Sequence, residues 1–164
     1  TAILFCTSYL KFGYSIETII SIILCSMLVI ITVSDLDSYI IPDSVLIICS
    51  ILIFGLYFYE YKIIPLNNLL NGVASFIFMF LIKMLGNFIL KKESMGDGDI
   101  KLMAVVGMVI GFKKAILSLF LASYLGLPYA IYIMVKKNVN HELPFGPFLS
   151  LASLILLFVD IRIF

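Results

Sequence analysis

Long apolar runs alternate with short polar stretches along almost the whole chain. After a partial run at Ala2–Leu10, six further apolar segments follow: Thr18–Ser34, Ser44–Tyr59, Leu69–Leu90, Ile100–Phe112, Ala115–Val135 and Phe145–Ile161. In lipid the backbone must satisfy its own hydrogen bonds, so segments of this kind predict helices rather than an open sheet. We therefore expect an all-α, polytopic membrane protein with about six transmembrane helices and a partial helix at the N-terminus.

The segment Ile100–Phe112 is unusually short. Its 13 residues make about 20 Å of helix, whereas the hydrocarbon core of a bilayer is about 30 Å thick. The segment is therefore re-entrant, or one of its ends starts below the membrane surface. The preceding residues 96–99, Gly-Asp-Gly-Asp, then lie near the bilayer boundary, where irregular backbone requires surrounding protein or water. Gly107 and Gly111, four residues apart, favour close helix packing.

Composition supports a membrane protein and excludes other classes. Apolar residues make up 63% of the chain and charged residues 13%, whereas soluble domains are nearer one half and one quarter. A net charge of +1 provides no basic face for phosphates, so no nucleic-acid partner is expected. Cys6, Cys25 and Cys49 lie in apolar runs without a CxxC pair, and neither a disulfide nor a zinc site is predicted.

The start of the chain indicates an excerpt. The first residue is Thr1 rather than Met, and the first apolar run stops at Lys11, short of the roughly 20 residues that a span requires. We expect residues 1–164 to form a single membrane-embedded domain that lacks an N-terminal segment.

The acidic residues are distributed unevenly. If the segments alternate in direction, the loops Asp35–Asp43, Lys91–Asp99 and Lys136–Leu143 share one side. That side carries seven of the ten acidic residues: Asp35, Asp37, Asp43, Glu93, Asp97, Asp99 and Glu142. The basic residues divide nearly evenly, so the positive-inside rule does not fix the orientation.

Two of these acidic clusters are candidates for chemistry. An acid at membrane depth is unfavourable by about 3 kcal/mol or more, which makes it a functional hypothesis by default. Two carboxyls held close together share one proton, so that one can activate water while the other protonates a substrate carbonyl. This arrangement hydrolyses peptides without a metal, and no metal or other cofactor is predicted. His141 is the single histidine, which excludes a two-histidine zinc site; we interpret it as a solvated loop residue.

The glycine-rich cluster has a functional and a structural interpretation. Gly96 and Gly98 would let a substrate backbone approach closely, and the helix dipole would favour the anion of Asp99. In the alternative interpretation, Asp97 or Asp99 caps the helix and the glycines make a turn.

Other polar residues near these clusters are assigned supporting roles. Pro42 followed by Asp43 is typical of a helix start, and Asp37 is predicted to be a solvated carboxylate. Lys101 lies on a different helix face from Asp99 and is expected to tune that acid or to contact lipid headgroups. Lys83, inside an apolar run, is expected to snorkel or to make a polar contact.

Three motifs together resemble a known family. Asp35 followed by six residues and then Pro42-Asp43, and later the run from Gly96 to Leu102, resemble the type IV prepilin peptidases, which are GxGD-type aspartyl proteases of bacterial membranes. The run 143–148, Leu-Pro-Phe-Gly-Pro-Phe, is similar to the Pro-Phe-Gly-Pro segment of that family.

The resemblance implies a function and a site. Asp35 and Asp99 would be the catalytic pair of a multi-pass protein in the bacterial inner (cytoplasmic) membrane. The substrate partner would be a prepilin or pseudopilin, cleaved on the cytoplasmic side before its hydrophobic helix. Many members also carry paired CxxC motifs associated with N-methylation from S-adenosylmethionine. Nothing of that kind occurs here, so no methyltransferase activity is predicted for this stretch.

Two alternatives belong to other functional classes. Broken, glycine-interrupted helices also suit an ion-coupled transporter or channel subunit, although no inverted repeat is seen and the acids cluster at helix ends. A non-catalytic assembly subunit of a secretion machine would use the acids as interface groups.

Overall fold

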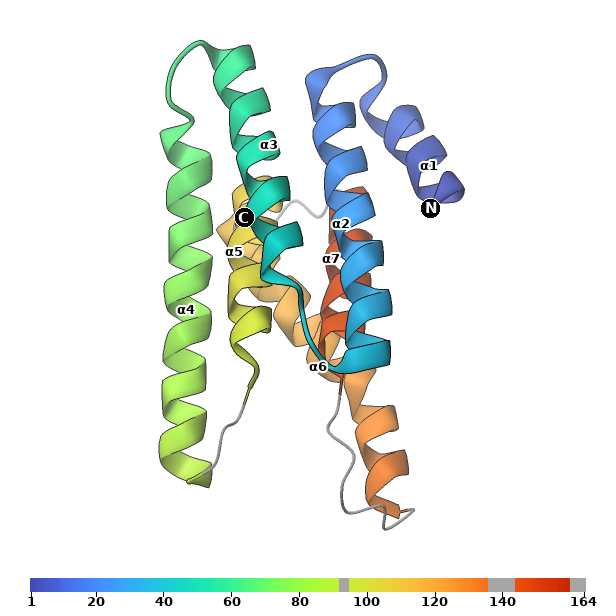
Figure 1. Cartoon of the computed structure of the whole chain (residues 1–164), viewed down its shortest axis with the longest axis vertical. Coiled ribbons are helices and arrows are strands. Elements are labelled where there is room, and N and C mark those ends of the chain that lie inside the picture. The colour runs from blue at the N-terminus through green and yellow to red at the C-terminus, as the bar shows by residue number, and fades with distance from the viewer. Residues whose placement is uncertain (92–94, 136–143, 160–164) are drawn as a thin grey trace.

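The computed structural model describes residues 1–91, 95–135 and 144–159, and these form helices and connecting turns without a strand (Figure 1). The helices are α1 (Ala2–Phe12), α2 (Ile16–Ser38), α3 (Asp43–Tyr61), α4 (Leu66–Leu90), α5 (Asp97–Ile110), α6 (Phe112–Val135) and α7 (Gly146–Phe158). Each predicted apolar segment overlaps one of these helices, although the bounds differ by several residues, and the all-α prediction is confirmed for the described residues.

Among the described residues, four helices are long and apolar enough to cross a membrane: Ile16–Ser38, Asp43–Tyr61, Leu66–Ile89 and Phe112–Tyr132. α5 has 14 residues and α7 has 13, so the predicted count of six crossings is not confirmed. Large apolar side chains such as Ile51, Phe80 and Phe88 remain exposed on the outer helix faces. In water such a surface would be unfavourable, which supports a multi-pass membrane protein that contacts lipid.

The short helix α5 is antiparallel to α4 and packs along it. Near the end of α5, the Asn68 side-chain amide donates to the Met108 carbonyl at 3.2 Å. Lys83 of α4 pairs with Asp97, the first residue of α5, at 2.5 Å. From Lys83, α4 continues to Leu90, which is about two turns or 10 Å further along its axis. The first turn of α5 therefore begins inside the length of its neighbour, which supports the interpretation that this segment starts below the level of the neighbouring helix end.

The C-terminal ends of α2, α4 and α6 and the N-terminal ends of α5 and α7 lie toward one end of the bundle, the lower end in Figure 1. This agrees with the alternation inferred from the sequence. Five of the seven acids assigned to that side are described there: Asp35, Asp37, Asp43, Asp97 and Asp99. Glu93, Glu142 and the predicted solvated His141 lie outside the described residues.

Gly107 confirms the prediction of close helix packing, and Gly111 does not. A Cβ atom added to Gly107 would lie 2.6 Å from the Ser75 Cβ and 3.0 Å from the Asn71 carbonyl oxygen, both on α4. Gly111 instead follows the last residue of α5 with φ of +87°, and an added Cβ would meet nothing within 4 Å. The packing role predicted for Gly111 is therefore wrong, because this glycine ends the helix in a conformation that other residues rarely adopt.

The Gly107→Ala variant is expected to lower the thermal midpoint of the detergent-solubilised protein. Forcing a methyl group into a filled helix interface destabilises by about 1–3 kcal/mol. The matched control is Gly55→Ala, since an added Cβ there meets nothing within 4 Å. Adding Ser75→Gly to Gly107→Ala removes the nearest clash and is expected to restore part of the loss. An unchanged midpoint for Gly107→Ala would show that α4 and α5 do not approach this closely.

Candidate active site

Asp35 lies in the last turn of α2, with its side chain directed at the start of α7. The backbone N–H of Tyr39, which ends α2 in the left-handed region, donates to the Asp35 carbonyl at 3.1 Å. The Asp35 side chain is buried, and its Oδ2 accepts a hydrogen bond from the Gly146 backbone N–H at 3.0 Å. A Cβ atom at Gly146 would lie 2.8 Å from the same Oδ2. Glycine is therefore needed for α7 to begin against this carboxyl.

Asp99 lies in the first turn of α5, and its carboxyl is also buried. Its Oδ1 has no hydrogen-bond partner in the part of the chain that the structure describes. Gly96 precedes the helix, and no side chain of the described residues caps it. The alternative interpretation, in which Asp97 or Asp99 serves as the cap, is therefore wrong. A buried carboxyl oxygen without a partner is unfavourable in a folded protein and calls for a role.

The two acids share one cavity of about 130 Å³. Its lining comes from three turns far apart in the sequence: Asp35, Tyr39, Ile41, Gly96, Gly98, Asp99, Pro144 and Phe145. The volume exceeds the roughly 30 Å³ that one water molecule occupies in the liquid. The fold thus brings together both predicted catalytic acids and both predicted glycines beside a space that admits water.

The two carboxyls are in different electrostatic surroundings. Asp99 lies outside the four helices long enough to span a bilayer, and burial raises the pKa of its carboxyl to about 7, with the charge of Asp35 acting in the same direction. Asp35 has the hydrogen bond from the Gly146 N–H, at a helix N-terminus, which favours a negative charge there. Burial therefore outweighs the helix dipole, and the expectation that Asp99 is the anion is wrong. The arrangement places a carboxyl with a raised pKa, Asp99, beside one with a hydrogen-bond donor for its anion, Asp35.

Gly98 is explained by packing within the chain itself. A Cβ atom added there would lie 2.7 Å from the Ile41 Cβ. Glycine therefore lets the α2–α3 turn close over the start of α5 and form one wall of the cavity. The predicted approach of a substrate backbone to Gly96 and Gly98 stays a prediction.

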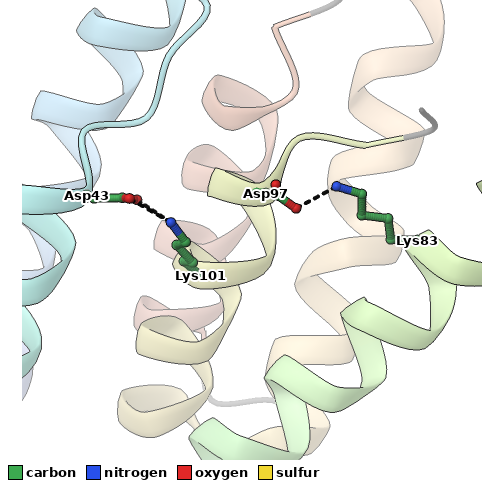
Figure 2. A network of polar contacts seen from close by, with 4 residues as sticks. All are labelled: Asp43, Lys83, Asp97 and Lys101. Atoms are coloured by element: carbon green, nitrogen blue, oxygen red, sulfur yellow. Dashed lines mark hydrogen bonds and ion pairs between the residues drawn. The ribbon is translucent and has the colours of Figure 1, made fainter.

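Two ion pairs hold the first turn of α5 between its neighbours, as Figure 2 shows. Lys101 donates to both carboxylate oxygens of Asp43 at the start of α3, at 2.6 and 2.8 Å. Lys83 of α4 pairs with Asp97, and this hydrogen bond lowers the pKa of the exposed Asp97 carboxyl. Lys83 thus makes the polar contact expected of it. Neither pair lines the cavity of Asp35 and Asp99.

The remaining predicted residues lie outside this cavity. Pro42 immediately precedes α3 and Asp43 is its first residue, which confirms the predicted helix start. Asp37 is exposed, and its carboxylate accepts a hydrogen bond from the Ser38 hydroxyl at 3.4 Å, as expected of a solvated carboxylate. The sequence alone predicts no role for Gly146, although this glycine lies within the 143–148 motif.

Comparison with known proteins identifies the family. A model of the type IV leader peptidase family matches residues 22–131, about two thirds of the chain. The chain belongs to the type IV leader peptidase family. The matched region contains Asp35 and Asp99, and the resemblance inferred from the motifs is confirmed. No solved structure matches this member of the family.

Curated relatives align with almost the whole chain. The prepilin leader peptidase/N-methyltransferase of Bacillus subtilis (strain 168) is 31% identical over 163 residues, which cover 94% of this chain and 61% of that protein. The protein of the same name from Neisseria gonorrhoeae is 31% identical, with 95% and 54% covered. The type 4 prepilin-like proteins leader peptide-processing enzyme of Escherichia coli O78:H11 is 29% identical, with 98% and 59% covered. The chain therefore spans about half to three fifths of the length of these relatives.

Proposed function

We propose that this chain is the peptidase domain of a membrane aspartyl endopeptidase that removes the leader peptide from prepilins or pseudopilins. The observation that carries the proposal is the meeting of Asp35 and Asp99 in one cavity. Both carboxyls are buried, one with a backbone donor and one with an oxygen that lacks a partner among the described residues. Family membership supports the same conclusion.

The geometry supports an acid–base mechanism on a bound water. Asp35, as the anion, removes a proton from the water, and the water oxygen attacks the carbonyl carbon of the scissile peptide bond. Asp99, still protonated, donates its proton to the carbonyl oxygen. In the second step the C–N bond breaks, and the proton on Asp35 passes to the departing amine while Asp99 regains its proton from the hydroxyl. No metal or cofactor takes part in this proposed scheme.

The side of cleavage and the location follow from the family resemblance and are part of the proposal. The acid-rich end of the bundle is assigned to the cytoplasmic side of the bacterial inner membrane. Opposite charges attract over about 10 Å at moderate salt, so this end would draw in a basic leader. The relatives' names include N-methyltransferase, but the prediction that this stretch carries no such activity stays a prediction.

Cleavage of a defined peptide tests the proposal. Membranes that contain the protein are incubated with a synthetic prepilin whose basic leader ends in glycine, followed by an apolar segment. Mass spectrometry is expected to find two fragments whose masses sum to that of the substrate plus one water. An intact substrate, together with ion flux when the medium is acidified, would favour the transporter alternative instead.

A further inference from the structure

The ion pair between Asp43 and Lys101 joins the two parts of the chain that carry the candidate catalytic acids. Asp35 lies in the last turn of α2, and the turn that follows α2 leads directly to Asp43, the first residue of α3. Asp99 and Lys101 both lie near the start of α5. The Lys101 Nζ lies 2.6 and 2.8 Å from the two carboxylate oxygens of Asp43, as Figure 2 shows. The pair therefore links the α2–α3 turn to the start of α5.

The same two elements also meet in an apolar contact that forms part of the acid cavity. A Cβ atom added to Gly98 would lie 2.7 Å from the Ile41 Cβ, so the α2–α3 turn and the start of α5 are in close contact there. Ile41 and Gly98 both line the cavity that contains the two acids. The separation between the turn and the start of α5 therefore sets the width of this cavity.

Further along the helices, α3 and α5 leave a space between them. Residues of both helices, from the ion pair to Ser50 on α3 and Met108 on α5, line a groove of about 460 Å³ that α4 also borders. The packing of α4 on α5 is much closer, because a Cβ atom added to Gly72 would lie 2.9 Å from the Ala104 carbonyl oxygen. Backbone packing thus holds α5 against α4, whereas the attachment of α5 to α3 depends more strongly on the ion pair.

We propose that Asp43 and Lys101 are positioning residues that hold the Asp35 and Asp99 carboxyls at the separation the reaction requires; this inference rests on the proposed function. Neither Asp43 nor Lys101 lines the acid cavity, so the pair acts through the elements that it joins. Lys101 lies about 200° around α5 from Asp99, which directs the lysine to α3 and not to the acid. A displacement of about 1 Å in a catalytic group lowers the rate by about 10²-fold, so this link affects kcat.

The expected size of the effect follows from the exposure of the pair. The side chains of Lys101 and Asp43 are 46% and 55% exposed. Loss of an exposed ion pair changes an equilibrium by up to about fivefold, so neutral variants are expected to fold normally. Asp43→Asn and Lys101→Gln are each expected to lower kcat about threefold and to leave KM unchanged.

Charge reversal and charge exchange test the assignment more strongly. Lys101→Glu places a second carboxylate opposite Asp43, and this repulsion is expected to lower kcat about tenfold. KM is expected to stay within about twofold of the wild-type value, because the lining of the cavity is unchanged. Asp43→Lys is expected to have the same effect. The double variant Asp43→Lys/Lys101→Glu restores an ion pair of reversed sign, and its kcat is expected to return to within about threefold of the wild type.

Lys62→Glu is the matched control for charge reversal. Lys62 is exposed and follows the last residue of α3, at the end opposite Asp43, and this variant is expected to keep the wild-type kcat. Salt concentration provides a second readout at saturating substrate. Raising the salt to about 1 M shortens the screening length to about 3 Å. This change is expected to lower the wild-type kcat about twofold and to leave that of Asp43→Asn/Lys101→Gln unchanged.

The possible failures are distinguishable when each rate is divided by the folded fraction of that variant. If the wild type does not cleave the synthetic prepilin, the proposed function is wrong and the inference falls with it. If the wild type cleaves and Lys101→Glu keeps its kcat, the pair does not position the acids. A double variant no more active than the single reversals would show that the losses do not come from the pair. A raised KM with an unchanged kcat would place the pair in substrate binding and would also overturn the inference.

Discussion

Asp35→Asn and Asp99→Asn are each expected to lower kcat/KM for prepilin cleavage by about 10⁴-fold, the upper range for the loss of a catalytic acid or base. The two side chains share a cavity, and the proposed reaction needs a proton acceptor on one and a proton donor on the other. Asparagine has nearly the same shape as aspartate but cannot transfer a proton in this way. The rate is measured by the appearance of mature peptide in mass spectra.

Two neighbouring acids provide the matched controls. Asp37 and Asp97 lie within two residues of the catalytic candidates but are exposed outside the cavity. Asp37→Asn and Asp97→Asn are expected to stay within tenfold of the wild-type rate. A wild-type rate for either Asp35→Asn or Asp99→Asn would show that this carboxyl is not catalytic.

Gly146→Ala is expected to lower kcat by about 10²-fold while KM changes little. The added Cβ would lie 2.8 Å from the Asp35 Oδ2 and 3.1 Å from its Cγ, so either the carboxyl or the start of α7 must shift. A displacement of about 1 Å in a catalytic group is enough for such a loss. Initial rates over a range of substrate concentrations separate kcat from KM.

Gly126→Ala is the matched control for this substitution. An added Cβ at Gly126 would lie 3.6 Å from the Phe148 ring, which is an ordinary contact between α6 and α7. This variant is expected to keep the wild-type kcat. Equal activity of Gly146→Ala and Gly126→Ala would mean that α7 does not hold the Asp35 carboxyl.

The helices and the acidic clusters could be predicted from the sequence because both depend on the polarity of short stretches of the chain. Lipid requires internally hydrogen-bonded segments, and the apolar runs delimit them. Acids at helix ends are unusual in such apolar surroundings, and this predicts the two acidic clusters; the choice of Asp35 and Asp99 within them follows from the family resemblance. The count of crossings was less predictable, since α5 has 14 residues and α7 has 13, fewer than the roughly 20 that a span requires.

Contacts between elements far apart in the sequence could not be predicted from it. The donor to Asp35 is the backbone N–H of Gly146, 111 residues away, and a backbone donor does not depend on the side chain present. The partner of Lys83 was unpredictable for a similar reason, because it depends on how far α5 is displaced along α4. Gly98 and Gly111 look alike in the sequence, yet one makes room for Ile41 and the other ends a helix.

The pH dependence of cleavage tests most directly whether the two acids work as one pair. Because burial raises the pKa of Asp99 to about 7, this carboxyl holds the proton it must donate below that pH and loses it above. The account predicts that kcat/KM falls above about pH 7, by tenfold per pH unit, with an apparent pKa that belongs to the pair. Asp97→Asn removes an exposed acid outside the cavity, and kcat/KM of this variant is expected to show the same decrease above about pH 7. A kcat/KM that stays constant from about pH 6 to pH 9 would contradict the claim that the Asp35 and Asp99 carboxyls share one proton during the reaction.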